Sequence, residues 1–135
     1  MHQYKKGERG QSLVEVALTL PILLMLLLGL FDLGRAYFIL VELNDAADEG
    51  ATYAAIRYTD VSGIQNRAVD AATMVKLSPG DVVLTGPPAN AIGQPVTVTV
   101  STDMRLFTPF VNTLVGGGDV LTLRGRAIHP IITLP

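Results

Sequence analysis

The chain has 135 residues, which leaves room for one small domain once an apolar segment is set aside. Only 16% of its residues are charged, against about 25% in an ordinary soluble domain, and the excess of apolar residues is concentrated near the N-terminus. A net charge of −2 gives no basic surface for nucleic acid, and the lack of cysteine excludes disulfides, thiolate catalysis and cysteine-ligated metals.

The first element in chain order is an apolar segment. Residues 13–31 read LVEVALTLPILLMLLLGLF, with Glu15 as the only charge. As a helix rising about 1.5 Å per residue, this segment spans roughly 28 Å, close to the hydrocarbon core of a bilayer at about 30 Å. A buried helix of a soluble protein is the alternative, but the segment is apolar on every face. We therefore predict three parts: a leader at 1–10, the transmembrane part of a helix at 11–31, and an extracytoplasmic domain at 32–135.

The charges around this segment predict its orientation. Lys5, Lys6 and Arg9 precede it, so the positive-inside rule places the N-terminus in the cytoplasm and the C-terminal domain outside. A secretory signal peptide is the nearest competitor, but Gly34-Arg35-Ala36 offers only a poor cut site for it. The sequence thus predicts a single-pass protein of the cytoplasmic membrane.

Glu15 lies five residues after Gly10, and this spacing bears on its function. An ionisable residue inside an apolar helix is a functional hypothesis by default, although such a carboxylate can also reach the interface or stay neutral. The stretch RGQSLVEVALTLPILLML resembles the type IV prepilin signal, in which a basic leader ends in glycine and glutamate is fifth after the cut. The resemblance implies cleavage between Gly10 and Gln11 by a membrane-bound prepilin peptidase.

A longer stretch resembles one family of pilin-like proteins. GQSLVEVALTLPILLMLLLGLFDLGRAYF, followed by EGATYAA, is similar to the TadE family of tight-adherence pilus pseudopilins, and the likeness covers residues 9–58. The family shares the V-E-x-A-L-x-L-P, G-R-x-Y and E-G-A-x-Y-A-A motifs. This chain departs from it at Asp48 and Thr52, where the family often has arginines, so contacts made by those arginines are not carried over.

The resemblance implies a function and a set of partners. It implies a structural subunit, a minor pilin or pseudopilin of a tight-adherence (type IVc) pilus used in cell adhesion. The partners would be the prepilin peptidase, other pilins or pseudopilins, the assembly platform of the secretion system and its ATPase. The protein would then be a homo- or hetero-oligomer in a filament, reaching the outside of the cell in a pilus.

Physical chemistry gives the cut a consequence. Cleavage creates an α-amino group at the head of an apolar helix, and Glu15 of the same or a neighbouring subunit can pair with it. Removing one partner of a buried ion pair costs about 3–5 kcal/mol, so the pair would fix the register of packed helices. Pro21 lies in the middle of the span, where we expect a mild kink; the alternative is a local melting point used when the subunit leaves the bilayer.

The helical pattern continues past the membrane. Residues 32–58 contain no proline and are rich in alanine and leucine, so we predict one helix over 11–58. One apolar stripe recurs at spacings of three and four: Leu33, Ala36, Tyr37, Leu40, Leu43, Ala47, Ala51 and Ala54. For Gly50 and Ala54 two interpretations stay open, core packing and a contact between subunits. The acidic residues at 42–49 lack a calcium loop and predict a solvated face, or a docking patch.

The C-terminal part of the chain predicts a short helix followed by strands. Ser62 and Gln65 fit a capping box that opens a short helix ending near Leu77, before Ser78-Pro79-Gly80. Residues 81–85, 95–102 and 119–129 predict about three antiparallel strands with one buried face. With the long helix this gives a pilin-like α+β fold. Arg124 and Arg126 fall on the exposed face, either solvated or in contact with a neighbouring subunit.

No catalytic or metal-binding constellation emerges from the sequence. His2 lies in the leader, His129 is a lone histidine with an expected structural role, and Gly116-Gly117-Gly118 precedes a strand, as a hairpin connection would. We expect no enzyme activity, no cofactor and no metal. Two further hypotheses keep the architecture: the abundant subunit of the filament, and an uncut, anchored domain that binds a ligand or partner outside the cell.

Overall fold

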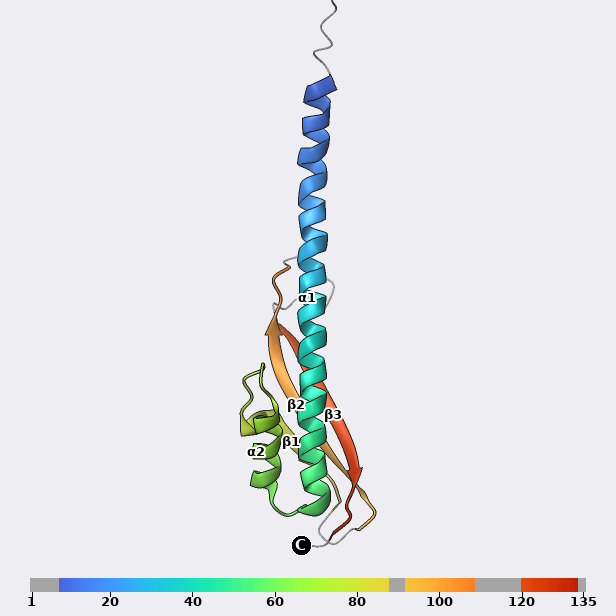
Figure 1. Ribbon diagram of the computed structural model, residues 1–135, viewed down its shortest axis with the longest axis vertical. Helices are drawn as coiled ribbons and strands as arrows, with labels where there is room; N and C mark the ends of the chain where they lie inside the picture. The colour runs from blue at the N-terminus through green and yellow to red at the C-terminus, as the bar shows by residue number, and fades with distance from the viewer. Residues whose placement is uncertain (1–7, 88–91, 109–119, 134–135) are drawn as a thin grey trace, which may run out of the picture.

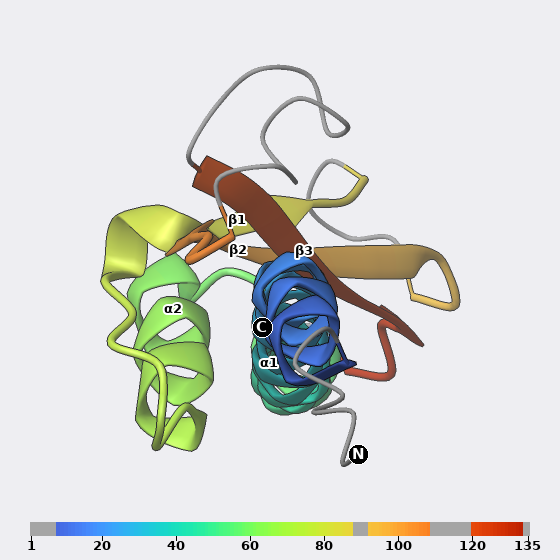
Figure 2. The ribbon, with the colours of Figure 1, turned by 90° about the horizontal axis from the view of Figure 1, so that it is seen from above.

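The protein is a long helix with a small domain built on its C-terminal half. The computed structural model describes residues 8–87, 92–108 and 120–133. Its elements are α1 (Glu8–Ile56), α2 (Val61–Ala71), the 3₁₀ turn η1 (Pro79–Asp81), β1 (Val82–Thr85), β2 (Pro95–Arg105) and β3 (Val120–Pro130). Figure 1 shows the N-terminal half of α1 projecting alone, and Figure 2 shows α1 and α2 on one side of the sheet. The predicted α+β fold is confirmed; Gly116-Gly117-Gly118, His2 and most of the leader lie outside the described residues.

The sheet has the predicted alternation. Its order is β1-β2-β3 with both pairs antiparallel. Val96, Val98 and Val100 are fully buried toward the helices, whereas the residues between them face outward. Strand β2 runs on to Arg105 rather than ending at Thr102, because β3 pairs with it along its whole length. The extension returns Met104 to the buried face.

Helix α1 is continuous from leader to domain. It passes through Pro21 without a break and begins at Glu8, a little before the predicted start. It ends at Ile56 rather than at residue 58, where the C-terminal segment takes over its last carbonyls. The amide of Ile132 donates to the carbonyl of Ala55 at 2.9 Å, and the Thr133 hydroxyl donates to the carbonyl of Ile56 at 3.0 Å. These bonds satisfy carbonyl groups that have no partner within the helix.

The predicted boundaries of the short helix were wrong at both ends. Its N-cap is Asp60, not Ser62, and the Asp60 carboxylate accepts a hydrogen bond from the Gly63 amide at 2.9 Å. Helix α2 then ends at Ala71 instead of Leu77. The amides of Thr73 and Met74 donate to the Glu42 carboxylate on α1 rather than to carbonyls of α2, so the helical hydrogen bonding cannot continue.

The buried stripe of α1 matches the prediction only in its C-terminal half. Leu43, Ala47, Ala51 and Ala54 are fully buried in the core that α1 forms with α2 and the sheet. The N-terminal half of the predicted stripe was wrong, since Leu33 is 70% exposed and Tyr37 is 65% exposed. In this part of α1 the buried residue that faces the sheet is Asp32, and Ile39 is partly buried against the core. A carboxylate on the core face hid the true stripe from an apolar pattern.

Strand β3 crosses α1 at backbone distance. Gly125 is buried against the Leu43 carbonyl group and the Asn44 amide, and a Cβ at this position would overlap the helix backbone. Beside it, the amide of Arg126 donates to the Asn44 side-chain oxygen at 3.1 Å, which satisfies a donor of the edge strand. Glycine at this crossing thus sets how closely the sheet approaches the helix.

We predict that Gly125→Ala destabilises the domain by about 1–3 kcal/mol, because the added methyl must push strand and helix apart. Gly80→Ala is the matched control, since a Cβ at Gly80 meets no atom within 4 Å. It should change the free energy of unfolding by less than about 0.5 kcal/mol. Urea unfolding of the detergent-solubilised chain, followed by circular dichroism, measures both. Equal stability of the two variants would show that the crossing tolerates a side chain.

Candidate membrane and assembly site

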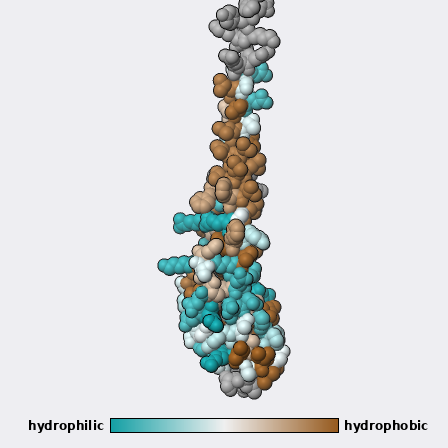
Figure 3. Space-filling view, in the orientation of Figure 1, coloured by the Kyte–Doolittle hydropathy of each residue, from teal (hydrophilic) through white to brown (hydrophobic). Residues whose placement is uncertain are grey.

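The N-terminal half of α1 presents apolar side chains in every direction. Within the described residues one helix is long and apolar enough to cross a membrane, and its most apolar stretch is not covered by the rest of the chain. Figure 3 shows this hydrophobic column above a domain whose visible surface is mostly hydrophilic. Leu13 is 71% exposed and Phe31 is 73% exposed, at the two ends of the predicted span. This surface supports anchoring of the protein by a single pass through a membrane.

The predicted cleavage residues lie at the free end of this column. Gly10, Gln11 and Glu15 are exposed on α1, and they line a shallow surface hollow together with Val14 and Leu18. Gln11 and Glu15 are four residues apart and therefore share one face of the helix. The bond between Gly10 and Gln11 lies in the first turns of α1, whose amides have no acceptor within the helix. This is the part of a helix that opens most readily.

Asp32 marks the border between column and domain. It is only 3% exposed, and its carboxylate accepts hydrogen bonds from the amides of Phe107 at 3.0 Å and Thr108 at 2.9 Å and from the Thr108 hydroxyl at 2.7 Å. Burial opposes ionisation, but the bonds from Thr108 and Phe107 outweigh it, so the pKa of Asp32 lies below its ordinary value. The carboxylate fastens the segment after β2 to the helix at the end of the membrane span.

A second carboxylate of α1, nearer the C-terminal end of the helix, holds another segment of the domain. Glu42 accepts hydrogen bonds from the amides of Thr73 and Met74, in the connection that follows α2. Burial again works against the charge, but the bonds from Met74 and Thr73 prevail and lower the pKa of Glu42. Two acidic residues of α1 thus hold two separate segments of the domain by their backbone amides.

The sequence patterns missed these anchoring residues. The apolar pattern gives no role to Asp32, and the acidic pattern places Glu42 only on a solvated face. One available signal was the position of Asp32, a carboxylate immediately after an apolar span, where a charge is costly unless it has partners. Nothing local marked Glu42, because its partners lie in a segment far along the chain that the sequence predicted to be helical.

The other singled-out residues fall in two places. Gly50 and Ala54 lie in the core of the subunit, where a Cβ on Gly50 would stand 3.2 Å from both the Ala68 Cβ and the Val98 Cγ1. Core packing therefore accounts for them and leaves no surface for a neighbouring helix. Arg124 and Arg126 are exposed on the outer face of the sheet, as the alternation predicted.

The acidic face of α1 makes a second specific contact besides that of Glu42. Asp48 lies 2.8 Å from Nε2 of His129, so this histidine joins the end of β3 to the helix. No group of three or more metal-ligating side chains occurs in the part of the chain that the structure describes.

The helix with its two anchoring carboxylates can be compared with known proteins. Residues 10–52 match the model of the TadE-like protein family. The matched segment begins at Gly10 and includes Glu15, Asp32 and Glu42, whereas the sheet lies beyond it. The resemblance expected from the motifs is confirmed over this segment, and it relates the chain to the tight-adherence pilus. No curated protein and no solved structure matches the chain.

Asp32 makes the border sensitive to acid. Because the pKa of Asp32 is lowered on folding, its hydrogen bonds contribute their full stability above the ordinary carboxyl pKa of 3.8. This stability is lost as the pH falls through the lower pKa of the folded state. We predict that Asp32→Asn frees the segment at neutral pH, at a cost of about 1–3 kcal/mol. Hydrogen exchange of the Phe107 and Thr108 amides should then accelerate.

The matched control for this prediction is Asp45→Asn, which changes an exposed aspartate of the same helix. It should leave exchange at Phe107 and Thr108 unchanged. Unaltered protection of both amides in Asp32→Asn would show that the carboxylate does not hold the segment.

Proposed function

We propose that this protein is a TadE-like minor pilin or pseudopilin, a structural subunit cut after Gly10 and used in the assembly of a tight-adherence pilus. The observation that carries the proposal is the single helix α1, whose first half is apolar and uncovered while its second half is the core of the domain. Such a helix holds the subunit in the bilayer first and offers the same apolar surface to other subunits afterwards.

The N-terminal residues support processing. Gly10 is exposed and lacks a side chain, so a protease can approach its backbone closely. A Cβ there would meet no atom within 4 Å, so the fold itself does not require glycine at this position. Cleavage would leave the amine of Gln11 one helical turn from Glu15 on the same face. Pairing of this amine with Glu15, within a subunit or between neighbours, would remove two uncompensated charges from an apolar assembly.

The family match suggests the partners. A prepilin peptidase at the cytoplasmic face would make the cut, and the platform proteins and ATPase of the pilus machine would move the subunit out of the membrane. Other pilins or pseudopilins would then pack against the exposed column. The domain would face the outside of the cell, with the leader in the cytoplasm.

Two other functions use the same architecture. As the abundant filament subunit, the protein would dominate sheared pili, whereas a minor pilin would be scarce in them. As an anchored domain that binds a partner outside the cell, it would keep its leader. The Gly10 to Glu15 spacing favours assembly over this last function, because anchoring alone does not require it.

Co-expression with an active prepilin peptidase tests the proposal. The intact mass of the membrane-extracted protein should correspond to a chain beginning at Gln11, and Gly10→Val should keep the leader because the larger residue obstructs the cut. A wild-type chain that remains full-length beside an active peptidase would contradict the proposal.

The same experiment separates cutting from assembly. Glu15→Ala should still be cut but should be strongly depleted from sheared filaments, because the new amine loses its partner. Glu49→Ala removes an exposed glutamate of the same helix outside the predicted span and should assemble normally. Normal assembly of Glu15→Ala would refute the pairing of Glu15 with the new N-terminus.

A further inference from the structure

Large apolar side chains remain exposed at the base of the domain, just beyond the predicted membrane span. Three of them lie on α1, and the fourth is Phe107, in the segment that follows β2, which is 69% exposed. We call this set the girdle, and it consists of Leu33, Tyr37, Phe38 and Phe107. Exposed apolar side chains gathered at one level of a small domain mark a surface that meets a partner.

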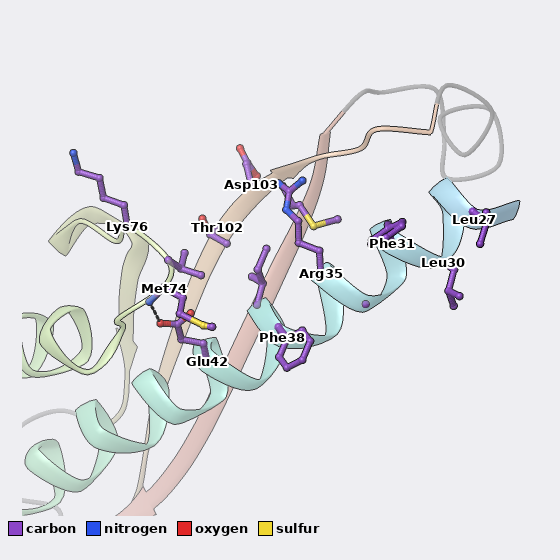
Figure 4. A pocket seen from close by; sticks show the side chains of 14 residues that line it. Leu27, Leu30, Phe31, Arg35, Phe38, Glu42, Met74, Lys76, Thr102 and Asp103 are labelled. Carbon is purple, nitrogen blue, oxygen red and sulfur yellow. Dashed lines mark hydrogen bonds between the residues drawn. The ribbon is translucent and has the colours of Figure 1, made fainter. Parts of the chain in front are cut away.

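The girdle residues point in different directions around the axis of α1. At about 100° per residue, Tyr37 points about 40° and Phe38 about 140° away from Leu33. Figure 4 shows Arg35 pointing toward β2 and Phe38 pointing away from it. Phe107 lies on the β2 side, because its ring centre is 5.0 Å from the guanidinium of Arg35. The girdle therefore surrounds the helix instead of forming a single face.

Another side of α1 carries an apolar groove at the same level. The groove has a volume of about 560 Å³ and lies between the helix, the segment that follows β2 and the start of β3. Leu33, Leu106 and Leu121 are among its lining residues. Of the described residues that line it, only Asp32 and Thr108 are polar, and the Thr108 hydroxyl donates to the Asp32 carboxylate at 2.7 Å. The groove thus continues the apolar surface between the girdle residues.

The girdle stands at the level of lipid headgroups. Leu33 lies about 3 Å and Phe38 about 10 Å beyond Phe31, the last residue of the predicted span. The headgroup layer extends roughly 5–7 Å beyond the hydrocarbon core on each side. Within the described part of the domain, the segment that follows β2 reaches furthest toward the N-terminal half of α1 (Figure 1). A tyrosine at this level, Tyr37, is typical of the aromatic belt at a membrane surface.

The charged side chains at this level are compatible with a headgroup layer. The Asp32 carboxylate is buried and accepts hydrogen bonds from the amides of Phe107 and Thr108, so it does not face the lipid. The Arg35 guanidinium donates to the carbonyl of Arg105 at 3.3 Å. Its methylene groups can contact apolar surface while the charge stays among polar headgroups.

We propose that the girdle is a membrane-contact surface that seats the base of the domain in the headgroup layer on the domain side of the bilayer. Leu33, Tyr37 and Phe38 contact lipid around α1, and Phe107 inserts beside them. The partner is the bilayer surface as a whole, without selection of one headgroup. This contact goes beyond the role in pilus assembly and requires only that α1 spans a membrane.

A second copy of the chain is the competing occupant. A protein packed against α1 covers one side of the helix and would leave the girdle residues on the other sides in water. A bilayer covers all sides at once, and it already surrounds the apolar column that continues into the girdle. The distribution of the girdle around α1 therefore favours the bilayer.

Fluorescence quenching by brominated lipid tests the proposal. The chain has no tryptophan, so a single introduced tryptophan reports its own surroundings. The full-length protein is placed in vesicles of phosphatidylcholine brominated near the top of its acyl chains. Phe107→Trp and Phe38→Trp, on different sides of α1, should each be quenched several-fold more than Ile128→Trp. Ile128 is the matched control, because it is an exposed apolar residue on the outer face of the sheet.

Leu24→Trp, in the predicted span, shows whether α1 has entered the bilayer and should be quenched. Phe107→Trp quenched no more than Ile128→Trp, beside a quenched Leu24→Trp, would overturn the proposal and leave the span intact. Quenching of Phe38→Trp without that of Phe107→Trp would show a contact on one side only and would also overturn it. Both girdle variants keep an aromatic side chain at an exposed position, so they preserve the packing of the domain. None of these results bears on cleavage after Gly10, so the two proposals fail separately.

Discussion

One uninterrupted helix has to suit two surroundings, lipid along its first half and a protein core along its second. The change occurs at Asp32, whose carboxylate is buried at the point where the sheet first reaches the helix. A buried carboxylate is costly unless hydrogen bonds compensate it, and the amides of Phe107 and Thr108 do so. The same bonds hold the segment that follows β2 against α1, so the domain begins immediately where the apolar column ends.

On the domain side of this border, the packing is governed by small side chains. The face of α1 toward the core is mostly alanine with Gly50, and the facing strands supply valines from β2 and Gly125 from β3. Close approach of helix and strand lets a small domain bury a continuous core with few large residues. Polar contacts at the rim, from Asn44 to Arg126 and from Asp48 to His129, fix the position of the edge strand. The helix is therefore the spine of the domain as well as its anchor.

Periodicity could predict the elements, because a long apolar helix and alternating strands both leave strong local patterns. The long helix, the three strands and the outward position of Arg124 and Arg126 all follow from such patterns. The end of α2 could not be predicted in this way, because it is set by Glu42, a residue distant in sequence that binds the amides of Thr73 and Met74. The lower half of the buried stripe failed for a related reason: Asp32 occupies a core position that an apolar pattern assigns to Leu33. Motif spacing located the candidate residues Gly10, Gln11 and Glu15, whereas the anchoring carboxylates needed the fold.

The central claim is that α1 is one rigid helix from the bilayer into the domain, and a distance across the border tests it most directly. The chain has no cysteine, so Leu18→Cys with Thr52→Cys places two spin labels on exposed positions of α1 without further changes. Pulsed electron paramagnetic resonance in lipid bilayers should give a narrow distribution near about 51 Å, the length of a continuous helix between these residues. A broad or markedly shorter distribution would reveal a hinge and contradict the account.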